Sequence, residues 1–302
     1  MTTFKSTIKI VSFLVFVFAF ASVAQAQATR TWVSGVGDDV NPCSRTAPCK
    51  TFAGAISKTA VNGEINCLDP AGYGAVTVTK SITIDCEDTQ GSILSAGTNG
   101  VIVNITSVTD TKKAFKLRGV SIQGAGTGIN GIRVLAANTV HLDEVVIDGV
   151  TQHGVSIETT AGSPKVFVQD THIRSVAGNG INTFIIGGAV NLVVGGSQLQ
   201  AAGTGLSLSN NTAATITDSQ ITGSATGLVA ANASIAVRNC TISNNTTGVS
   251  SLGGGSIRLM GSMVTTNGTG LSLGGGSIVS HISNVFSGNT VDGAPSSSLA
   301  LQ

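Results

Sequence analysis

Short apolar segments that begin with glycine recur through the second half of the chain. They start at Gly131, Gly154, Gly180, Gly205, Gly227, Gly248 and Gly270, with spacings of 21 to 26 residues. The last four of these glycines each follow a threonine. A fixed period of this length predicts a solenoid, in which every turn stacks on its neighbours.

A second motif lies within each repeat. In the segments 216–221, 237–242 and 259–264, an apolar and a polar residue precede a turn residue, and a small, a polar and an apolar residue follow it. The turn residues are Asp218, Asn239 and Gly261. All three residue types tolerate a left-handed backbone, so each is expected to form a corner between two short strands.

Together with the glycine-led strand, this motif predicts three short strands in each turn. Leucine-rich repeats share the period, but their L-x-x-L-x-L frame is absent from the chain. We therefore predict an all-β fold, a single-stranded right-handed parallel β-helix of about ten turns, because connections between parallel strands are right-handed.

Residues 1–26 have the features of a secretory signal peptide. Lys5 and Lys9 precede the apolar run Ile10–Phe20, and Ala24 and Ala26 provide the small residues of a cleavage site. A membrane anchor is the alternative, but this run is too short to span a bilayer. No second run of spanning length follows it, so we expect a secreted or periplasmic protein without a membrane span in the mature chain.

The rest of the chain is expected to divide into three parts. Residues 27–63 are predicted to form an N-terminal cap segment, because the end of a solenoid needs a cap. A short helix over Lys50–Ala60 would gather four apolar side chains on one face: Phe52, Ala53, Ile56 and Ala60. Residues 64–290 are predicted to form the β-helix, and residues 291–302 a frayed C-terminal tail.

Four of the five cysteines lie in the first third of the chain. Cys43 and Cys49 flank a short polar loop, and Cys67 and Cys86 form the other local pair. We predict both disulfides, because an exported chain meets oxidising conditions. A zinc site is the weaker interpretation, since no C-x-x-C motif occurs.

Cys240 is the unpaired cysteine, and the repeat alignment predicts its environment. The aligned positions hold Val145, Thr171, Ser197, Ser219, Ser262 and Ser283. These residues are small and follow the corner residue, so we predict an inward-facing column. Cys240 is then a buried and unreactive thiol.

Composition narrows the classes of function. The chain has 302 residues, 41% of them hydrophobic and 10% charged, which is not the composition of a disordered protein. Removal of Lys5 and Lys9 with the signal peptide changes the net charge from +1 to −1. No overall field therefore favours nucleic acid or anionic membrane as a partner. Only seven aromatic residues remain in the mature chain, too few for an exposed row of stacking aromatics.

The N-terminal segment resembles a known family. The residues that carry the resemblance are Thr31–Pro42, Pro48–Phe52 and Ala55–Ile56, followed by Glu64–Pro70 and Lys80–Cys86 in what looks like the first turn. They are similar to secreted bacterial proteins of the pectin-lyase-like right-handed β-helix superfamily. That superfamily includes polysaccharide lyases, glycoside hydrolases, phage tailspikes and adhesins, so the resemblance implies the fold and no single activity.

The motifs of the superfamily's enzymes are not reproduced. Lyases resembling pectate lyase hold Ca²⁺ with carboxylates and use an arginine base in an R-x-P-x-x-R context, and the chain has no R-x-P. Hydrolases resembling polygalacturonase carry N-T-D, D-D, G-H-G and R-I-K, whereas this chain offers only Asp143-Glu144 and Gln152-His153-Gly154. We predict neither a metal site nor a cofactor.

Charged side chains concentrate in one region. Residues 110–175 hold thirteen of them, and residues 176–302 hold four. The repeat alignment places Arg118 beside Asp143 and Asp148 beside Arg174, with His172 one column away. One interpretation is a ladder of surface ion pairs, each worth at most about 1 kcal/mol.

The other interpretation of this region is a polysaccharide site. The candidate catalytic residues are Asp143, Asp148, His172 and Arg174, with Asp143 or Asp148 as acid or base and Arg174 on a sugar carboxylate. The candidate ligand-binding residues are Arg118, Asp143, Asp148 and Arg174.

Three functions fit these observations to different degrees. We predict a secreted, non-catalytic scaffold, adhesin-like, that binds carbohydrate or a surface, with polysaccharide or a cell-surface glycan as its partner. The alternative is a divergent polysaccharide lyase or glycoside hydrolase with a site near residues 116–174. Ice binding would need a uniform outward column of threonine. The corresponding column is mixed: Gln123, Asp148, Arg174, Gln200, Thr222, Ser243 and Thr265.

Overall fold

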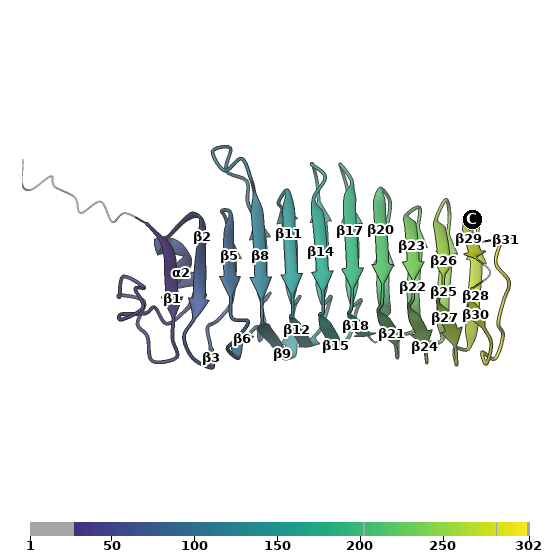
Figure 1. Cartoon of the computed structure of the whole chain (residues 1–302), viewed down its shortest axis with the longest axis horizontal. Coiled ribbons are helices and arrows are strands. Elements are labelled where there is room, and N and C mark those ends of the chain that lie inside the picture. Colours follow the sequence, from purple (N-terminus) through teal and green to yellow (C-terminus); the bar gives the residue numbers. More distant parts are fainter. Residues whose placement is uncertain (1–26, 202, 282, 301–302) are drawn as a thin grey trace, which may run out of the picture.

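The computed structural model describes residues 27–201, 203–281 and 283–300. The predicted signal peptide, residues 1–26, lies outside the described residues. The described chain forms one elongated rod, in which short parallel strands stack along the long axis (Figure 1). In the described residues these strands make three sheets, named here sheets I, II and III.

Sheet I has 12 strands in the described residues: β1 (Ala28–Val33), β2 (Thr59–Cys67), β5 (Ile82–Asp85), β8 (Ala114–Arg118), β11 (Thr139–Asp143), β14 (Lys165–Gln169), β17 (Val190–Gly195), β20 (Thr212–Thr217), β23 (Ser234–Arg238), β26 (Ser256–Met260), β29 (Ser277–His281) and β31 (Ser297–Leu299). Sheet II has 10 among the same residues: β3 (Ala71–Gly72), β6 (Gly91–Leu94), β9 (Val120–Gly128), β12 (Val146–Val150), β15 (His172–Val176), β18 (Gln198–Ala201), β21 (Gln220–Thr222), β24 (Thr241–Ser243), β27 (Met263–Thr265) and β30 (Val285–Phe286). Sheet III has nine in this part of the chain: β4 (Val76–Val78), β7 (Val101–Asn104), β10 (Ile132–Ala136), β13 (Val155–Thr159), β16 (Ile181–Ile185), β19 (Thr204–Leu208), β22 (Thr226–Ala231), β25 (Thr247–Leu252) and β28 (Thr269–Gly274).

Each turn of the rod visits the sheets in the same order. The chain passes from sheet I to sheet II to sheet III and returns to sheet I one turn further along, as β8, β9, β10 and β11 do. All the paired strands are parallel, as in the register of β8 on β11 and of β11 on β14. The predicted parallel β-helix of about ten turns is therefore confirmed.

Most of the core consists of columns of aliphatic side chains along the rod, and Phe115 of β8 occupies one of these columns. Side chains alternate inward and outward along each strand. One inward column of sheet I is Val140, Val166, Leu192, Ala214, Ile235, Ile257 and Ile278, all buried. Full burial of one such side chain stabilises a fold by about 1.5–3 kcal/mol, and each turn achieves it only against its neighbours.

The corners between sheets I and II have the predicted backbone. Asp218, Asn239 and Gly261 have φ values of 51°, 53° and 57°, in the left-handed region. Glu144 and Asp170 occupy the same corner in earlier turns, with φ values of 53° and 47°. One left-handed residue turns the strand direction sharply, so the corner needs no longer loop.

A short helix, α2 (Phe52–Lys58), covers the first turn. Thr51 caps its N-terminus, because the Thr51 hydroxyl accepts a hydrogen bond of 2.9 Å from the Gly54 N–H. The predicted buried face was partly wrong: Phe52 and Ala55 are buried, and Ala53 is exposed. Ala60 is also not helical. The backbone becomes extended at Thr59, where β2 begins.

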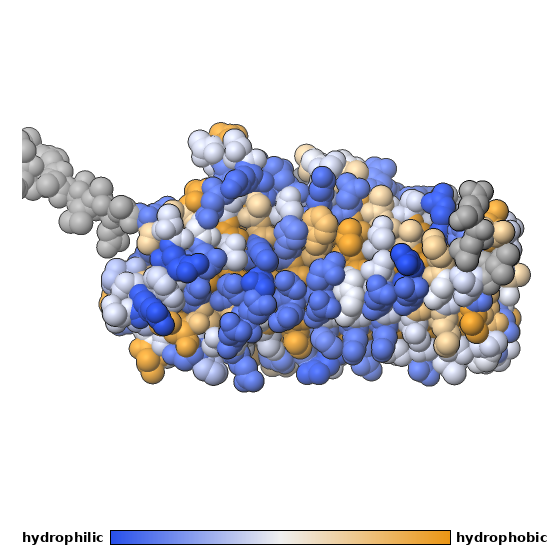
Figure 2. All heavy atoms as spheres, in the orientation of Figure 1, coloured by the Kyte–Doolittle hydropathy of each residue, from blue (hydrophilic) through white to orange (hydrophobic). Residues whose placement is uncertain are grey.

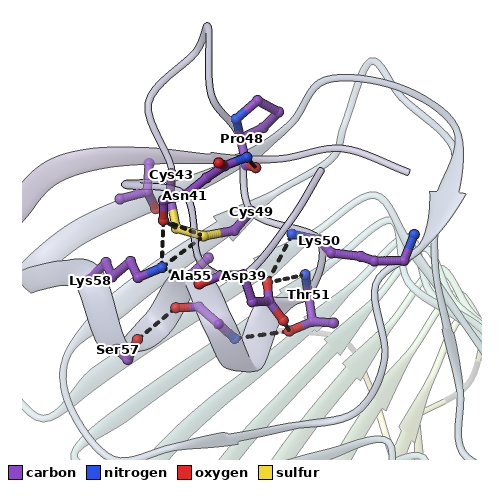
Figure 3. Close-up of a disulfide and its surroundings, with 12 residues drawn as sticks. Asp39, Asn41, Cys43, Pro48, Cys49, Lys50, Thr51, Ala55, Ser57 and Lys58 are labelled. Atoms are coloured by element: carbon purple, nitrogen blue, oxygen red, sulfur yellow. Dashed lines mark hydrogen bonds between the residues drawn. A yellow bond between two sulfur atoms is a disulfide. The ribbon is translucent and has the colours of Figure 1, made fainter. Parts of the chain in front are cut away.

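The loop before α2 is held by a disulfide and by two charged side chains (Figure 3). Cys43 is bonded to Cys49. The ammonium of Lys58 donates to the carbonyl oxygens of Asp39 and Asn41. The Asp39 carboxylate accepts from the backbone N–H groups of Lys50 and Thr51 at 2.8 and 2.9 Å. These bonds fix the loop on the helix.

The second predicted disulfide, Cys67–Cys86, links β2 to the turn that follows β5. Cys240 is unpaired and buried, and burial raises the pKa of its thiol to about 11. The predicted column around it is present, with one correction. Asn284 takes the place in the last turn that was expected for Ser283, because Val285 rather than Asn284 is in register with Met263. The Asn284 Oδ1 accepts a 2.8 Å bond from the Ser262 N–H, and Ser283 is exposed.

The C-terminal segment is more ordered than a frayed tail. Within the predicted tail, Ser297–Leu299 forms β31, which pairs with β29 and extends sheet I. In the part of the chain that the structure describes, no helix is long and apolar enough to cross a membrane.

Candidate functional site

Arg118 lies at the end of β8, on the outer face near the corner between sheets I and II. Strand register places Asp85 of the preceding turn and Asp143 of the following turn on either side of it. The Arg118 Nη1 is 3.1 Å from Asp85 Oδ2, its Nε is 3.5 Å from Asp143 Oδ2, and its Nη2 contacts Glu87. We call Asp85, Glu87, Arg118 and Asp143 the Arg118 cluster.

The predicted pair of Arg118 with Asp143 is therefore one side of a larger arrangement. Burial lowers the pKa of Arg118, but the charges of Asp85, Glu87 and Asp143 outweigh burial and raise it. Asp85 was missed in the sequence, although the alignment of 82–85 with 115–118 would have revealed it. Glu87 lies in an irregular turn, where no repeat pattern could place it.

The second predicted pair lies on sheet II. Arg174 of β15 is in register with Asp148 of β12, and its Nε donates to Asp148 Oδ2 at 2.9 Å. The side chain of Arg174 is 55% exposed and that of Asp148 is 24% exposed. His172 lies two residues before Arg174 on the same strand and is also exposed.

The four candidate catalytic residues lie on two neighbouring sheets. Asp143 ends a strand of sheet I, whereas Asp148, His172 and Arg174 belong to sheet II, beyond the corner formed by Glu144. Asp143 and Asp148 each face an arginine at 3.5 and 2.9 Å. Both contacts use the Oδ2 atom of the carboxylate and join one turn of the rod to the next. Among the described residues, no group of three His, Cys, Asp or Glu side chains could hold a metal ion.

A third charged pair was missed, and it lies on sheet III. Arg133 of β10 holds Glu158 of β13 through two bonds, Nε to Oε1 at 3.0 Å and Nη2 to Oε2 at 2.6 Å. Ser156, in register with Arg133, donates to the same carboxylate at 2.9 Å. The hydrogen bonds from Arg133 lower the pKa of Glu158 against the opposing effect of burial. The glycine-led repeats at 131 and 154 contained the signal, because they align Arg133 with Ser156 and Glu158 follows two residues later on the same strand.

His153 lies close to this pair. Burial lowers the pKa of His153, although the charge of Glu158 acts in the opposite direction. The His153 Nδ1 accepts a hydrogen bond of 3.2 Å from the backbone N–H of Asn179. This bond links the imidazole to the next turn of the rod.

Comparisons with known proteins agree with the β-helix fold. A protein-family profile described as "Right handed beta helix region" matches residues 184–300. The enzymatically active domain of tailspike protein 2 from bacteriophage CBA120 is similar, with a TM-score of 0.59, 16% sequence identity, and coverage of 83% of this chain and 43% of the tailspike chain. Pectate lyase Pel9A has a TM-score of 0.56 and 14% identity, over 89% of this chain and 79% of that one.

A rhamnogalacturonan lyase gives a TM-score of 0.57 at 13% identity, covering 80% of this chain and 75% of its own. No curated protein sequence matches the chain. Identities this low establish the fold alone. The chain has a right-handed parallel β-helix fold similar to that of these lyases, and it spans less than half of the tailspike chain.

Proposed function

We propose that the protein is an exported, non-catalytic scaffold that binds a polysaccharide or a cell-surface glycan along its outer face. The observation that carries the proposal is the pairing of the candidate carboxylates. Asp143 and Asp148 each face an arginine and lie on different sheets. Ion pairs of this kind join one turn to the next, and this structural role supports a non-catalytic scaffold.

The glycan partner is supported by the fold and by the surface. The proteins with similar structures include a phage tailspike domain and two lyases named for pectate and rhamnogalacturonan. Hydrophilic side chains gather over β5, β8 and β11 on the sheet I face (Figure 2). An elongated polar face built from repeated turns suits an extended polymer, which can contact several turns at once.

Export is part of the proposal. It rests on the signal-peptide pattern of residues 1–26 and on the disulfides Cys43–Cys49 and Cys67–Cys86. Disulfides form and persist in oxidising compartments, which is where surface glycans are found.

A panel of neutral and uronate polysaccharides would test both halves of the proposal. We expect retention of the protein by at least one immobilised polysaccharide. We also expect no unsaturated products and no new reducing ends, with or without added Ca²⁺, after prolonged incubation. If the protein binds no polysaccharide of the panel, the proposal of a glycan partner is wrong.

The appearance of products would favour the alternative, a divergent lyase or hydrolase near residues 116–174. The enzyme alternative is supported by the similarity of the fold to two polysaccharide lyases. Asp143→Asn and Asp148→Asn would then locate the site, with Asp88→Asn as the matched control, because Asp88 is exposed between β5 and β6, two turns away. A hundredfold loss of turnover at an unchanged melting temperature would place the catalytic site at these residues.

A further inference from the structure

A small hollow lies on the outer face of sheet I, where the loop of residues 105–113 leaves the rod. This loop leads into β8 and stands out beyond its neighbours (Figure 1). The hollow measures about 210 Å³, and its lining includes Asn62, Thr83, Lys112, Lys116 and His141. We call it the lysine hollow.

The loop is anchored, so Lys112 has a defined position. Asp110 is only 3% exposed, and its carboxylate accepts from the Ser81 N–H and hydroxyl at 2.5 and 2.6 Å and from the Lys113 N–H at 3.0 Å. Burial raises the pKa of Asp110, but these hydrogen bonds outweigh it and keep the carboxylate charged. The bonds tie the loop to the start of β5 and hold Lys112 at the hollow.

Lys116 projects from β8 into the same hollow. Strand register places it between Thr83 of β5 and His141 of β11 on the outward face of the sheet. The imidazole of His141 stacks on the ring of Phe167 at 4.5 Å with an interplanar angle of 5°, which fixes its orientation at the rim. The hollow is therefore built from ordered strands and one pinned loop.

The ammonium groups of the two lysines are not paired with acids in the part of the chain that the structure describes. Neither the Lys112 Nζ nor the Lys116 Nζ lies within 4.0 Å of a carboxylate oxygen there, whereas the guanidinium groups of Arg118, Arg133 and Arg174 all do. The pKa of His141 responds to the nearby charges. Burial lowers this pKa, the positive charge of Lys116 lowers it further, and the negative charge of Asp143 raises it. Lys116 therefore affects the pKa of His141 more than Asp143 does.

We propose that the lysine hollow binds an anionic group of an acidic glycan, either a uronate carboxylate or a sulfate ester. Lys112 and Lys116 supply the charge, and Asn62 and Thr83 supply hydrogen-bonding groups beside it. The volume of about 210 Å³ is below the range of about 300–1,000 Å³ typical of drug-sized ligands. The hollow therefore takes one anionic group of a longer chain that continues over the sheet. This inference rests on the proposed glycan binding and names the class of glycan.

The test compares three soluble probes with the full-length mature protein by affinity electrophoresis: polygalacturonate, dextran sulfate and neutral dextran. The variant is Lys112→Gln combined with Lys116→Gln. The matched control is Lys165→Gln, which removes one exposed lysine from β14 of the same sheet, outside the hollow. A thermal melt of each protein confirms that the fold is retained.

We expect the double variant to bind one of the two acidic probes at least tenfold more weakly, with Lys165→Gln within twofold of the parent protein. Added salt should weaken the parent's binding, because the contact is ionic and exposed. The acidic probe that loses affinity tells carboxylate from sulfate. Unchanged affinity of the double variant for both acidic probes would overturn the lysine hollow while leaving glycan binding in place. If the parent protein binds none of the three probes, the proposed anion site in the lysine hollow is wrong. If it also binds no member of the wider polysaccharide panel, the proposed glycan binding is wrong as well.

Discussion

At the scale of single residues, the inward column that contains Cys240 accepts only small side chains. Behind the corner between sheets I and II, neighbouring turns place Ser219, Cys240 and Ser262, each about 2% exposed. The hydroxyls of Ser219 and Ser262 donate to carbonyl oxygens at 2.7 and 3.0 Å, and the Cys240 thiol faces the equivalent carbonyl of Arg238 at 3.1 Å. The position selects for a small side chain with a short donor.

We expect the Cys240 thiol to resist modification in the folded protein. It is buried, and burial raises its pKa to about 11, so the reactive thiolate is scarce at pH 8. A disulfide-exchange reagent followed by absorbance should report labelling only after denaturant is added. Stoichiometric labelling of the native protein within minutes would contradict the buried assignment.

Two substitutions of Cys240 probe the same column. Cys240→Ser should change the free energy of unfolding by less than about 1 kcal/mol, because serine fills the column in adjacent turns. Cys240→Leu should lower it by about 1–3 kcal/mol, because the packed column has no room for two more carbons. Equal effects of the two substitutions would rule out a size-limited column.

At the scale of elements, buried asparagines connect the turns at the corner between sheets II and III. The Asn267 Oδ1 accepts from the Asn245 N–H at 3.0 Å, and the Asn289 Oδ1 accepts from the Asn267 N–H at 2.9 Å. The Asn267 Nδ2 donates to the Ile242 carbonyl of the previous turn at 3.0 Å. The ladder satisfies backbone groups that the corner removes from sheet pairing.

Asn267→Ala should therefore destabilise the fold. The substitution leaves the Asn245 N–H without its partner in the interior and removes the bond to the Ile242 carbonyl, at a cost of about 1–3 kcal/mol. Chemical denaturation would measure the difference. Thr215→Ala on β20 is the control, because Thr215 is exposed and should lose less than about 0.5 kcal/mol. A cost for Asn267→Ala no larger than that of the control would show that the ladder contributes nothing.

At the scale of the whole molecule, the rod is a one-dimensional stack whose two ends differ. The N-terminal end carries α2, the disulfide Cys43–Cys49 and the extra strand β1. The C-terminal end finishes with β30 and β31, the last strands of sheets II and I, each paired on one side. In such a stack, stability depends on contacts between adjacent turns.

We expect amide hydrogen exchange to be graded along the rod. Peptides containing β14 and β15, which are paired on both sides, should exchange at least a hundredfold more slowly than peptides containing β30 and β31. The reason is that an end turn opens without disturbing two interfaces. Mass spectrometry of peptic peptides would measure the gradient. Equal protection at the centre and at the C-terminal end would instead indicate all-or-none unfolding.

The sequence repeat by itself determined the fold and many of the contacts between turns. The glycine-led period, the corners at Asp218, Asn239 and Gly261, and the column of Cys240 all follow from aligning one turn on the next. Parallel stacking places equivalent residues side by side, so a sequence alignment of turns already approximates a map of contacts. The disulfides followed from spacing, and the pairs of Arg118 with Asp143 and of Asp148 with Arg174 followed from register.

Only the tertiary structure determined the contacts made by residues that do not follow the repeat. Glu87 reaches Arg118 from an irregular turn, Asp110 pins a loop of unrepeated length, and Asn284 displaces Ser283 because the last turn is one residue longer than expected. The lysine hollow depends on where that pinned loop lies over sheet I. Loops between strands vary in length and lack a repeated pattern, so only packing in three dimensions determines which side chains they bring together.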